Sequence, residues 1–320
     1  MNKIELIIEH NGLNYQPVVE EPISWETERQ GVPGKLTFSV QKDAGLNFQE
    51  GDHLMLYVNK EKVFYGFIFT KKRNKDGLIS VTAYDQLRYL KNKDVIKYKE
   101  ITASALIQKL AKIFGMEVGE IEDTKYVIAD RLEQDKTLFD IIKNALNETQ
   151  QAKKELYVLY DDCRKLTLKN IKDMKLDILI NQNTAEDFDY ASSIDSKTYN
   201  RIKLFYESEK TGDLKIHPQE DAASIKRWGV LQHTEKVDNP QNAEEKAKNL
   251  LSMYNRKTRN LSVSKAFGDI RVRGGSLLSV SLDLGDVVAN TYMIVEKVKH
   301  TISADVHQMD LSLIGGDFSA

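Results

Sequence analysis

Histidine and carboxylate side chains are the first candidates for chemistry in this chain. Asp52 and His53 stand side by side after Gly51, and an imidazole beside a carboxylate is a typical general base. His53 also opens an apolar run, so we interpret both residues as solvated positions of a β-turn. His300 and His307 could face each other across a hairpin, but no two of the six histidines have the i, i+4 spacing that directs both to one metal. We predict no metal site; the other histidines are His10, His217 and His233.

The other reactive side chains are dispersed. Cys163 is the only cysteine, which excludes an internal disulfide and a multi-cysteine zinc site, and no nearby histidine activates its thiol. Residues 271–275, Arg-Val-Arg-Gly-Gly, lack the P-loop pattern and precede a strand, so we interpret them as a turn. An acid pair of the glycosidase kind would need carboxylates that all stand in turn-like sequence: Asp269, Asp283, Asp286, Glu235 and Asp238. We therefore predict no catalytic residue and no cofactor.

One short basic cluster and two tryptophans remain. Residues 71–75 read Lys-Lys-Arg-Asn-Lys, which we interpret as a solubilising hairpin tip; the alternative is a charge that lines a channel or meets an acidic partner. Trp25 and Trp228 are predicted to be core or interface residues rather than substrate platforms.

Composition limits the class of protein. A length of 320 residues exceeds one ordinary domain of about 100 to 200 residues, so two or more units are expected. The formal net charge of −2 argues against a dedicated nucleic-acid binder. Residues 1–9 place charges inside their apolar run, and no stretch approaches the roughly 18 to 20 apolar residues of a membrane span. We expect a soluble chain made in the cytoplasm.

The elements that carry these residues change in character along the chain. Residues 1–98 show alternating apolar and polar residues separated by turn formers, typical of antiparallel strands. Residues 102–115 and 137–146 have helical spacing, with Thr102 or Ser104 and Thr137 as candidate caps, and residues 156–169 read as a hairpin. From residue 176 strands return, interrupted by a short helix near 221–226 and a longer one over 242–255.

These patterns predict an α+β fold, mainly β, with two antiparallel β-barrel tube domains and two small α/β inserts. The first barrel is expected over residues 1–98 and a small α/β domain over 99–175. The second barrel combines residues 176–212 and 285–320, and an inserted α+β domain occupies 213–284.

The two β regions resemble each other weakly. Residues 51–56, 64–69 and 79–83 align in spacing with 275–280, 292–298 and 309–313, although few identities are shared. The similarity fits either an internal duplication or two unrelated meanders of similar strand length.

Residues 48–94 resemble the late-control or tail-hub proteins of contractile phages, in particular the hubs of defective prophages and phage-like bacteriocins of Gram-positive bacteria. The stretches 199–202, 227–232, 243–254 and 268–275 agree with this, although Gly275-Ser276 stands where the family usually has Gly-Asp. The resemblance covers about residues 1–315.

The resemblance implies a non-enzymatic hub, assembled into a tail baseplate in a bacterial cell. In such hubs a homotrimer presents six barrels, which matches a sixfold tail tube on one side and a threefold central spike on the other; the inserts would meet baseplate wedge proteins. R-type bacteriocins carry such tails. Ring-contact residues are not assigned from the sequence. The competing classes are a tail-associated cell-wall hydrolase and a cell-surface carbohydrate-binding module.

Overall fold

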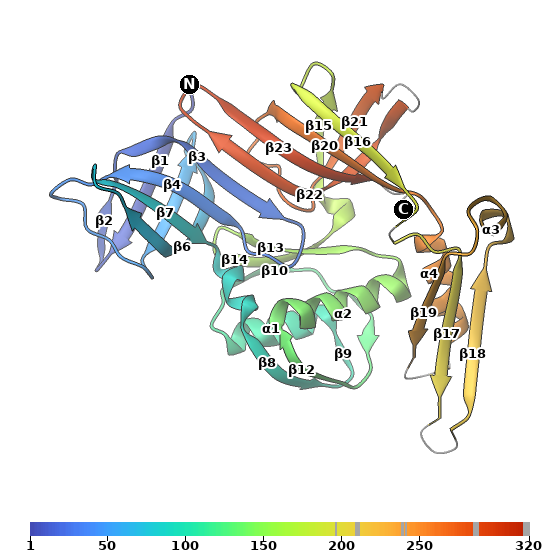
Figure 1. Ribbon diagram of the computed structural model, residues 1–320. Coiled ribbons are helices and arrows are strands. Elements are labelled where there is room, and N and C mark those ends of the chain that lie inside the picture. Colours follow the sequence, from blue (N-terminus) through green and yellow to red (C-terminus); the bar gives the residue numbers. More distant parts are fainter. Residues whose placement is uncertain (196, 209–211, 238–239, 241, 284–287, 316–320) are drawn as a thin grey trace.

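Strands build most of the molecule, which is described by a computed structural model for residues 1–195, 197–208, 212–237, 240, 242–283 and 288–315. Thirteen strands form one continuous sheet in two parts (Figure 1). The first half-sheet contains β1 (Ile4–His10), β2 (Leu13–Tyr15), β3 (Val19–Glu28), β4 (Lys35–Gln41), β5 (His53–Val58), β6 (Glu61–Arg73) and β7 (Leu78–Tyr84). The second half-sheet contains β15 (Lys175–Asn181), β16 (Asp187–Ser193), β20 (Thr258–Phe267), β21 (Leu277–Asp283), β22 (Val288–Ile302) and β23 (His307–Gly315).

Each half-sheet encloses its own apolar core. The alternating burial of strands such as β5 sends every second side chain inward, as period-two patterning requires. Leu54, Leu56 and Trp25 belong to the first core, and Val280, Val298 and Leu313 to the second. The predicted mainly β, antiparallel architecture is confirmed. Among the described residues the large sheet has one parallel pair, β15–β21, and two further parallel pairs lie in the smaller sheets.

Closure of either half-sheet into a barrel is not seen in the strand pairs of the described residues. Instead, β3 at the edge of the first half-sheet pairs with β22 of the second, from Lys297 opposite Glu28 to Ile302 opposite Ile23. The two halves therefore share one hydrogen-bonded ladder, and two separate barrels stay a prediction.

The two half-sheets have the same strand order. The path β1-β5-β6-β7-β4-β3 in the first corresponds to β15-β21-β22-β23-β20-β16 in the second, and chain order is preserved throughout. Four of the five neighbouring pairs agree in direction; only β1–β5, antiparallel, differs from the parallel β15–β21.

Local irregularities repeat as well. The β6–β7 ladder shifts register between Ile68 and Thr70, and the β22–β23 ladder shifts between Val295 and Lys297. Gly51 N–H donates to the Ile68 carbonyl at 2.8 Å, and Gly275 N–H donates to the Val295 carbonyl at 2.7 Å. A bulge bends a strand and fixes its register, so the same bulge beside the same glycine contact supports an internal duplication, in the alignment that the sequence suggested.

An α/β unit lies between the half-sheets in sequence and below both in Figure 1. Its helices α1 (Ala103–Ile113) and α2 (Leu138–Lys153) begin at the expected caps, since Thr102 accepts from Ala105 N–H and Thr137 forms a capping box with Asp140. The predicted hairpin is also present, as β13 and β14. The remaining elements are η1 (Gln86–Lys91), β8 (Lys93–Tyr98), β9 (Ile101–Thr102), β10 (Val118–Ile121), β11 (Val127–Ile128), β12 (Arg131–Thr137), β13 (Tyr157–Asp162), β14 (Lys165–Asn170) and η2 (Ile171–Met174).

A distal unit is inserted between β16 and β20. It comprises β17 (Arg201–Glu207), β18 (Leu214–Glu220), α3 (Ala222–Trp228), β19 (Gln232–Lys236) and α4 (Ala243–Tyr254). Its small core contains Ile202, Leu204 and Leu250.

The insert differs from its predicted boundaries in two places. Residues 201–207, expected within the second barrel, pair as β17 with β18 and β19 in the distal unit. Conversely β20 and β21, expected in the insert, pair within the large sheet. Alternating strands look alike in sequence whichever sheet they join, because pairing partners far along the chain leave no local signal.

Candidate functional site

The loop between β20 and β21, residues 268–276, is the point where three parts of the molecule meet. Gly274 N–H donates to Thr27 Oγ1 at 2.9 Å, and a Cβ on Gly274 would lie 2.2 Å from the backbone carbon of Glu28. The loop therefore touches the main chain of β3 directly. Only glycine permits so close an approach.

Arg273 ties the same loop to the α/β unit. Its Nη1 donates to the Asp161 carbonyl at 3.1 Å, its Nη2 lies 3.7 Å from Asp162, and its guanidinium stands 4.5 Å over the Tyr160 ring. A planar guanidinium makes such combined contacts, which a lysine ammonium does not reproduce. The β13–β14 hairpin is thereby fixed against the second half-sheet.

Asp85 ties the first half-sheet to the α/β unit, and Asp161 lies close to it within that unit. Asp85 accepts hydrogen bonds from the N–H groups of Gly34 and Leu87, at 2.8 and 3.0 Å. Gln86 Nε2 donates to Asp161 Oδ2 at 2.7 Å. Burial raises the pKa of Asp161 to about 6, and burial together with the nearby Asp161 raises the pKa of Asp85.

His300 lies under this loop, in the β3–β22 joint. Its Nε2–H donates to the Val272 carbonyl at 2.9 Å, which leaves Nδ1 to accept from His307 Nε2 at 3.0 Å. The His300 ring also stacks on Trp25 with centroids 4.7 Å apart. Complete burial, with His307 as a second cause, lowers the pKa of His300 to about 3. The ring is neutral and structural.

The predicted proximity of His300 and His307 is thus confirmed, and both His300 nitrogens are used by protein groups. Among the described residues no cluster of three or more histidine, cysteine or carboxylate side chains is placed to hold a metal ion.

Asp52 and His53 do not act on each other. Asp52 Oδ2 lies 2.8 Å from His10 Nδ1 and accepts from the Gln49 N–H, while His53 Nδ1 contacts the Tyr65 hydroxyl at 2.6 Å. The expectation of solvated turn residues was wrong for Asp52. Its side chain is only 11% exposed, because it contacts His10 at the end of β1 and accepts from the Gln49 N–H within its own turn. The His10 partner comes from another strand, so local sequence carried no signal for it.

Cys163 lies in the β13–β14 turn, where its Sγ approaches the Lys62 carbonyl at 3.3 Å. Burial raises the pKa of its thiol to about 11, which disfavours the reactive thiolate. The candidate acids are placed apart: Asp269 pairs with Arg271 in the joint, and Glu235 pairs with Lys246 in the distal unit. Asp283 ends β21, and Asp238 and Asp286 lie outside the described residues.

The remaining sequence candidates take structural positions. The basic cluster ends β6 and enters the β6–β7 turn, which confirms the hairpin tip. Residues 271–275 form a turn before β21, as predicted. Trp25 is a core residue, 3% exposed, and Trp228 is half-buried at the end of α3.

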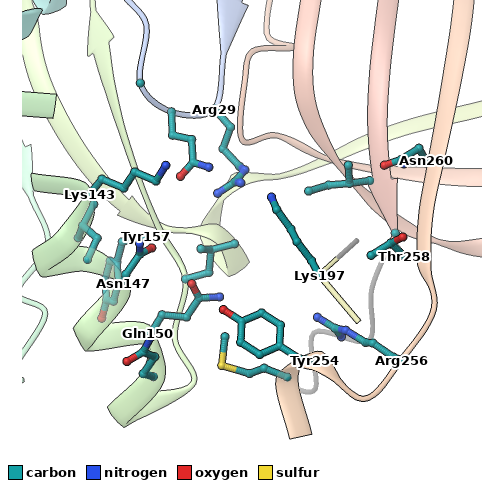
Figure 2. A pocket seen from close by; sticks show the side chains of 18 of the residues that line it. Arg29, Lys143, Asn147, Gln150, Tyr157, Lys197, Tyr254, Arg256, Thr258 and Asn260 are labelled. Atoms are coloured by element: carbon teal, nitrogen blue, oxygen red, sulfur yellow. The ribbon is translucent and has the colours of Figure 1, made fainter. Parts of the chain in front are cut away.

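A pocket of about 630 Å³ that sequence reasoning missed opens between α2, the β3–β4 turn and the distal unit (Figure 2). Apolar side chains such as Leu146 and Met253 contribute to its wall. Six cationic residues line it, and no aspartate or glutamate is among the described lining residues: Arg29, Lys143, Lys197, Arg256, Lys257 and Arg259. Arg29 is also paired with Glu296. The lining is nevertheless basic overall, which favours an anionic group with an apolar body. The contributing segments are far apart in sequence, so no local sequence motif indicates the pocket.

The fold is similar to that of solved tail and secretion proteins. The 43 kDa tail protein of prophage MuSo2 from Shewanella oneidensis superposes with a TM-score of 0.72 at 13% identity, covering 99% of this chain and all of that one. The c3393 protein of E. coli, a type VI secretion component described as similar to the T4 tail proteins gp27 and gp5, gives 0.54 at 10% identity, covering 99% of this chain and 78% of its own.

The chain belongs to the YqbQ-like family, whose model matches residues 23–314. It is 27% identical to YqbQ of Bacillus subtilis strain 168 over 308 residues, 93% of this chain and 92% of that protein. It is 25% identical over 304 residues to XkdQ, a protein of the phage-like element PBSX of the same bacterium, covering 90% of this chain and 92% of XkdQ. The resemblance to phage-tail proteins is therefore confirmed.

Proposed function

We propose that this chain is a non-enzymatic structural hub in the baseplate of a contractile phage-type tail, built as a homotrimer between the tail tube and the central spike. The observation that carries the proposal is the repeated strand order of the two half-sheets. Three copies would present six similar units toward a sixfold tube while keeping threefold symmetry toward a spike.

The relatives support a role in a tail. XkdQ belongs to a phage-like element, the MuSo2 protein is a tail protein, and c3393 is likened to gp27. The joint between β3 and β22 also suits a part under mechanical stress, because a continuous hydrogen-bonded ladder and the Arg29–Glu296 ion pair hold it.

The units have distinct roles in this proposal. The half-sheets are the tube-forming domains, with β20 and β21 assigned to the second and β17 to the distal unit. The α/β and distal units contact baseplate wedge proteins, and the tube and spike proteins dock on opposite faces of the ring. The chain is made in the bacterial cytoplasm and assembled into a phage tail or an R-type bacteriocin. No helix in the described part of the chain is long and apolar enough to cross a membrane.

The test is the mass of the purified chain by light scattering over a concentration series, alone and with its spike protein added. A mass of three chains in either run supports the hub. A chain that stays monomeric in both runs contradicts it, and peptidoglycan binding or hydrolysis then becomes the function to assay.

A further inference from the structure

The joint inside one chain provides a template for contacts between chains. Beyond the end of β21, one edge of β22 is free to pair, and β3 occupies it. Ion pairs join the two strands: Lys297 of β22 pairs with Glu26 and Glu28 of β3 at 3.2 and 3.1 Å. At the end of β3 the polarity is reversed, because Arg29 pairs with Glu296 of β22 at 2.6 Å.

The duplication defines the equivalent strands. In the shared strand order, β16 corresponds to β3 and β6 corresponds to β22. Because Ile68 and Val295 precede the same bulge, Thr70 corresponds to Lys297 and Arg73 to His300. Pairing with β4 and β20 likewise makes Tyr190 the equivalent of Trp25.

Both equivalents are unpaired on one edge. Among the described residues β16 pairs with β20 alone, and the main chain of residues 70–73 of β6 pairs with β7 alone, because the backbone hydrogen bonds of the segment leading into β5 end at Ile68. Beyond Ile68 that segment contacts β6 through the Lys71 side chain, whose Nζ donates to the Phe48 carbonyl. Thr70, Lys72 and Arg73 are exposed. An open strand edge is a template for another chain.

The free edges repeat the opposite charges of the inner joint. Glu186, Asp187 and Asp189 accompany β16, and no lysine or arginine occurs between residues 182 and 196. The end of β6 and its turn carry Lys71, Lys72, Arg73 and Lys75. The polarity of the Lys297 contacts is thus repeated: the edge that corresponds to β3, with its Glu26 and Glu28, is acidic, and the edge that corresponds to the Lys297 part of β22 is basic apart from Asp76 in the turn. The β6 and β16 edges lie on different half-sheets (Figure 1), so their partner is a second copy of this chain.

We propose that β16 of one copy adds to the free edge of β6 of the next, with Ser193 opposite Thr70 and Tyr190 opposite Arg73. This inference rests on the proposed trimer and assigns its contact. Strand addition supplies main-chain hydrogen bonds, while the charges select orientation and register. The contact is head-to-tail, and it closes into a ring when the rotation between copies repeats the rotation between half-sheets.

Cross-linking tests the register. In a Cys163→Ser background, we expect one of two cysteine pairs to give a covalent trimer on a non-reducing gel: Thr70→Cys with Ser193→Cys, or Lys71→Cys with Ser192→Cys. Both are made because hydrogen-bonded and non-hydrogen-bonded pairs alternate along a ladder and differ in Cα separation, so only one of the two suits a disulfide. The control, Thr70→Cys with Ala191→Cys, is two residues out of register and should cross-link far less. Trimers that form in solution without cross-linking at either designed pair would overturn the proposed register.

Charge exchange tests the partner. Lys72→Glu with Arg73→Glu should raise the concentration at which the trimer dissociates by about tenfold or more, and Asp187→Lys with Asp189→Lys should do the same. The four changes together should restore most of the affinity. Lys109→Glu with Lys112→Glu, on the exposed face of α1, is the matched control and should have no effect. A wild-type chain that stays monomeric even with the spike contradicts the hub proposal. A trimer whose dissociation does not change with these substitutions contradicts only the proposed interface.

Discussion

Acidification should weaken the joint between the half-sheets through His300. The ring is fully buried and neutral, and burial lowers its pKa to about 3, whereas an unfolded histidine titrates near 6.5. Between pH 6.5 and 3, His300 therefore binds a proton in the unfolded chain but not in the folded chain. Stability from this group is complete above pH 6.5 and is lost progressively as the pH falls toward 3.

The size of the effect follows from those two pKa values. At pH 7.5 almost no unfolded His300 is protonated, and at pH 5 nearly all of it is. The free energy of unfolding should therefore fall by about 2 kcal/mol between these pH values on account of His300. Asp161 acts in the opposite direction, because its raised pKa of about 6 makes the folded chain bind the extra proton. A single wild-type pH curve therefore mixes both effects.

A difference between two proteins isolates the histidine. Replacing Trp228 by Phe leaves Trp25, which stacks on His300, as the only tryptophan and the reporter of urea unfolding. In this background His300→Gln should be less stable than its parent at pH 7.5, and the gap should shrink by about 2 kcal/mol at pH 5. Ile302→Val, a change in the same joint that involves no titratable group, is the control and should show a gap independent of pH. A constant gap for His300→Gln as well would refute the neutral buried histidine.

Further predictions concern packing. Gly274→Ala should lower the free energy of unfolding by about 2 to 4 kcal/mol, because its methyl group would overlap the main chain of β3. Gly45→Ala is the control: a Cβ there would have its nearest neighbour at 3.5 Å, so the stability should change little. Equal losses for the two variants would contradict the argument. Arg273→Lys should speed proteolysis of the β13–β14 hairpin, and unchanged cleavage would show that the guanidinium contacts are dispensable. Leu250→Ala should lower the stability of the distal unit by about 2 to 5 kcal/mol. Trp228 fluorescence should then change at a lower urea concentration, while the transition reported by Trp25 stays where it was.

Local patterning accounts for the parts of the fold that the sequence predicted. Thr137 was predicted as a cap from local sequence, and the helix begins there; the structure adds Asp140, which completes a capping box. The basic cluster contains Asn74 and is followed by Gly77, and these two residues make the predicted turn. Alternating burial made the half-sheet strands recognisable, and the spacing around Gly51 and Gly275 was enough to suggest the duplication.

Long-range pairing accounts for what the sequence did not predict. Nothing near residue 201 shows that β17 lies outside the large sheet. Its position depends on pairing with β18 and β19 and on packing against α4, which begins some forty residues later. The joint is similar: Trp25 and His300 stack across 275 positions of sequence. The basic pocket combines three units in the same way, so its cations are unremarkable until the chain folds.

The length of β22 has a mechanical consequence. Its 15 residues run from the β21 ladder to the β3 ladder, so a pull along this strand loads many hydrogen bonds in shear at the same moment. The distal unit is attached differently: the chain enters it after β16 and returns before β20, with bonds such as that from Thr198 to the Arg256 carbonyl at its base. Tension applied there opens contacts one after another. Under force the distal unit should yield first, while the two half-sheets move together as one stiff body.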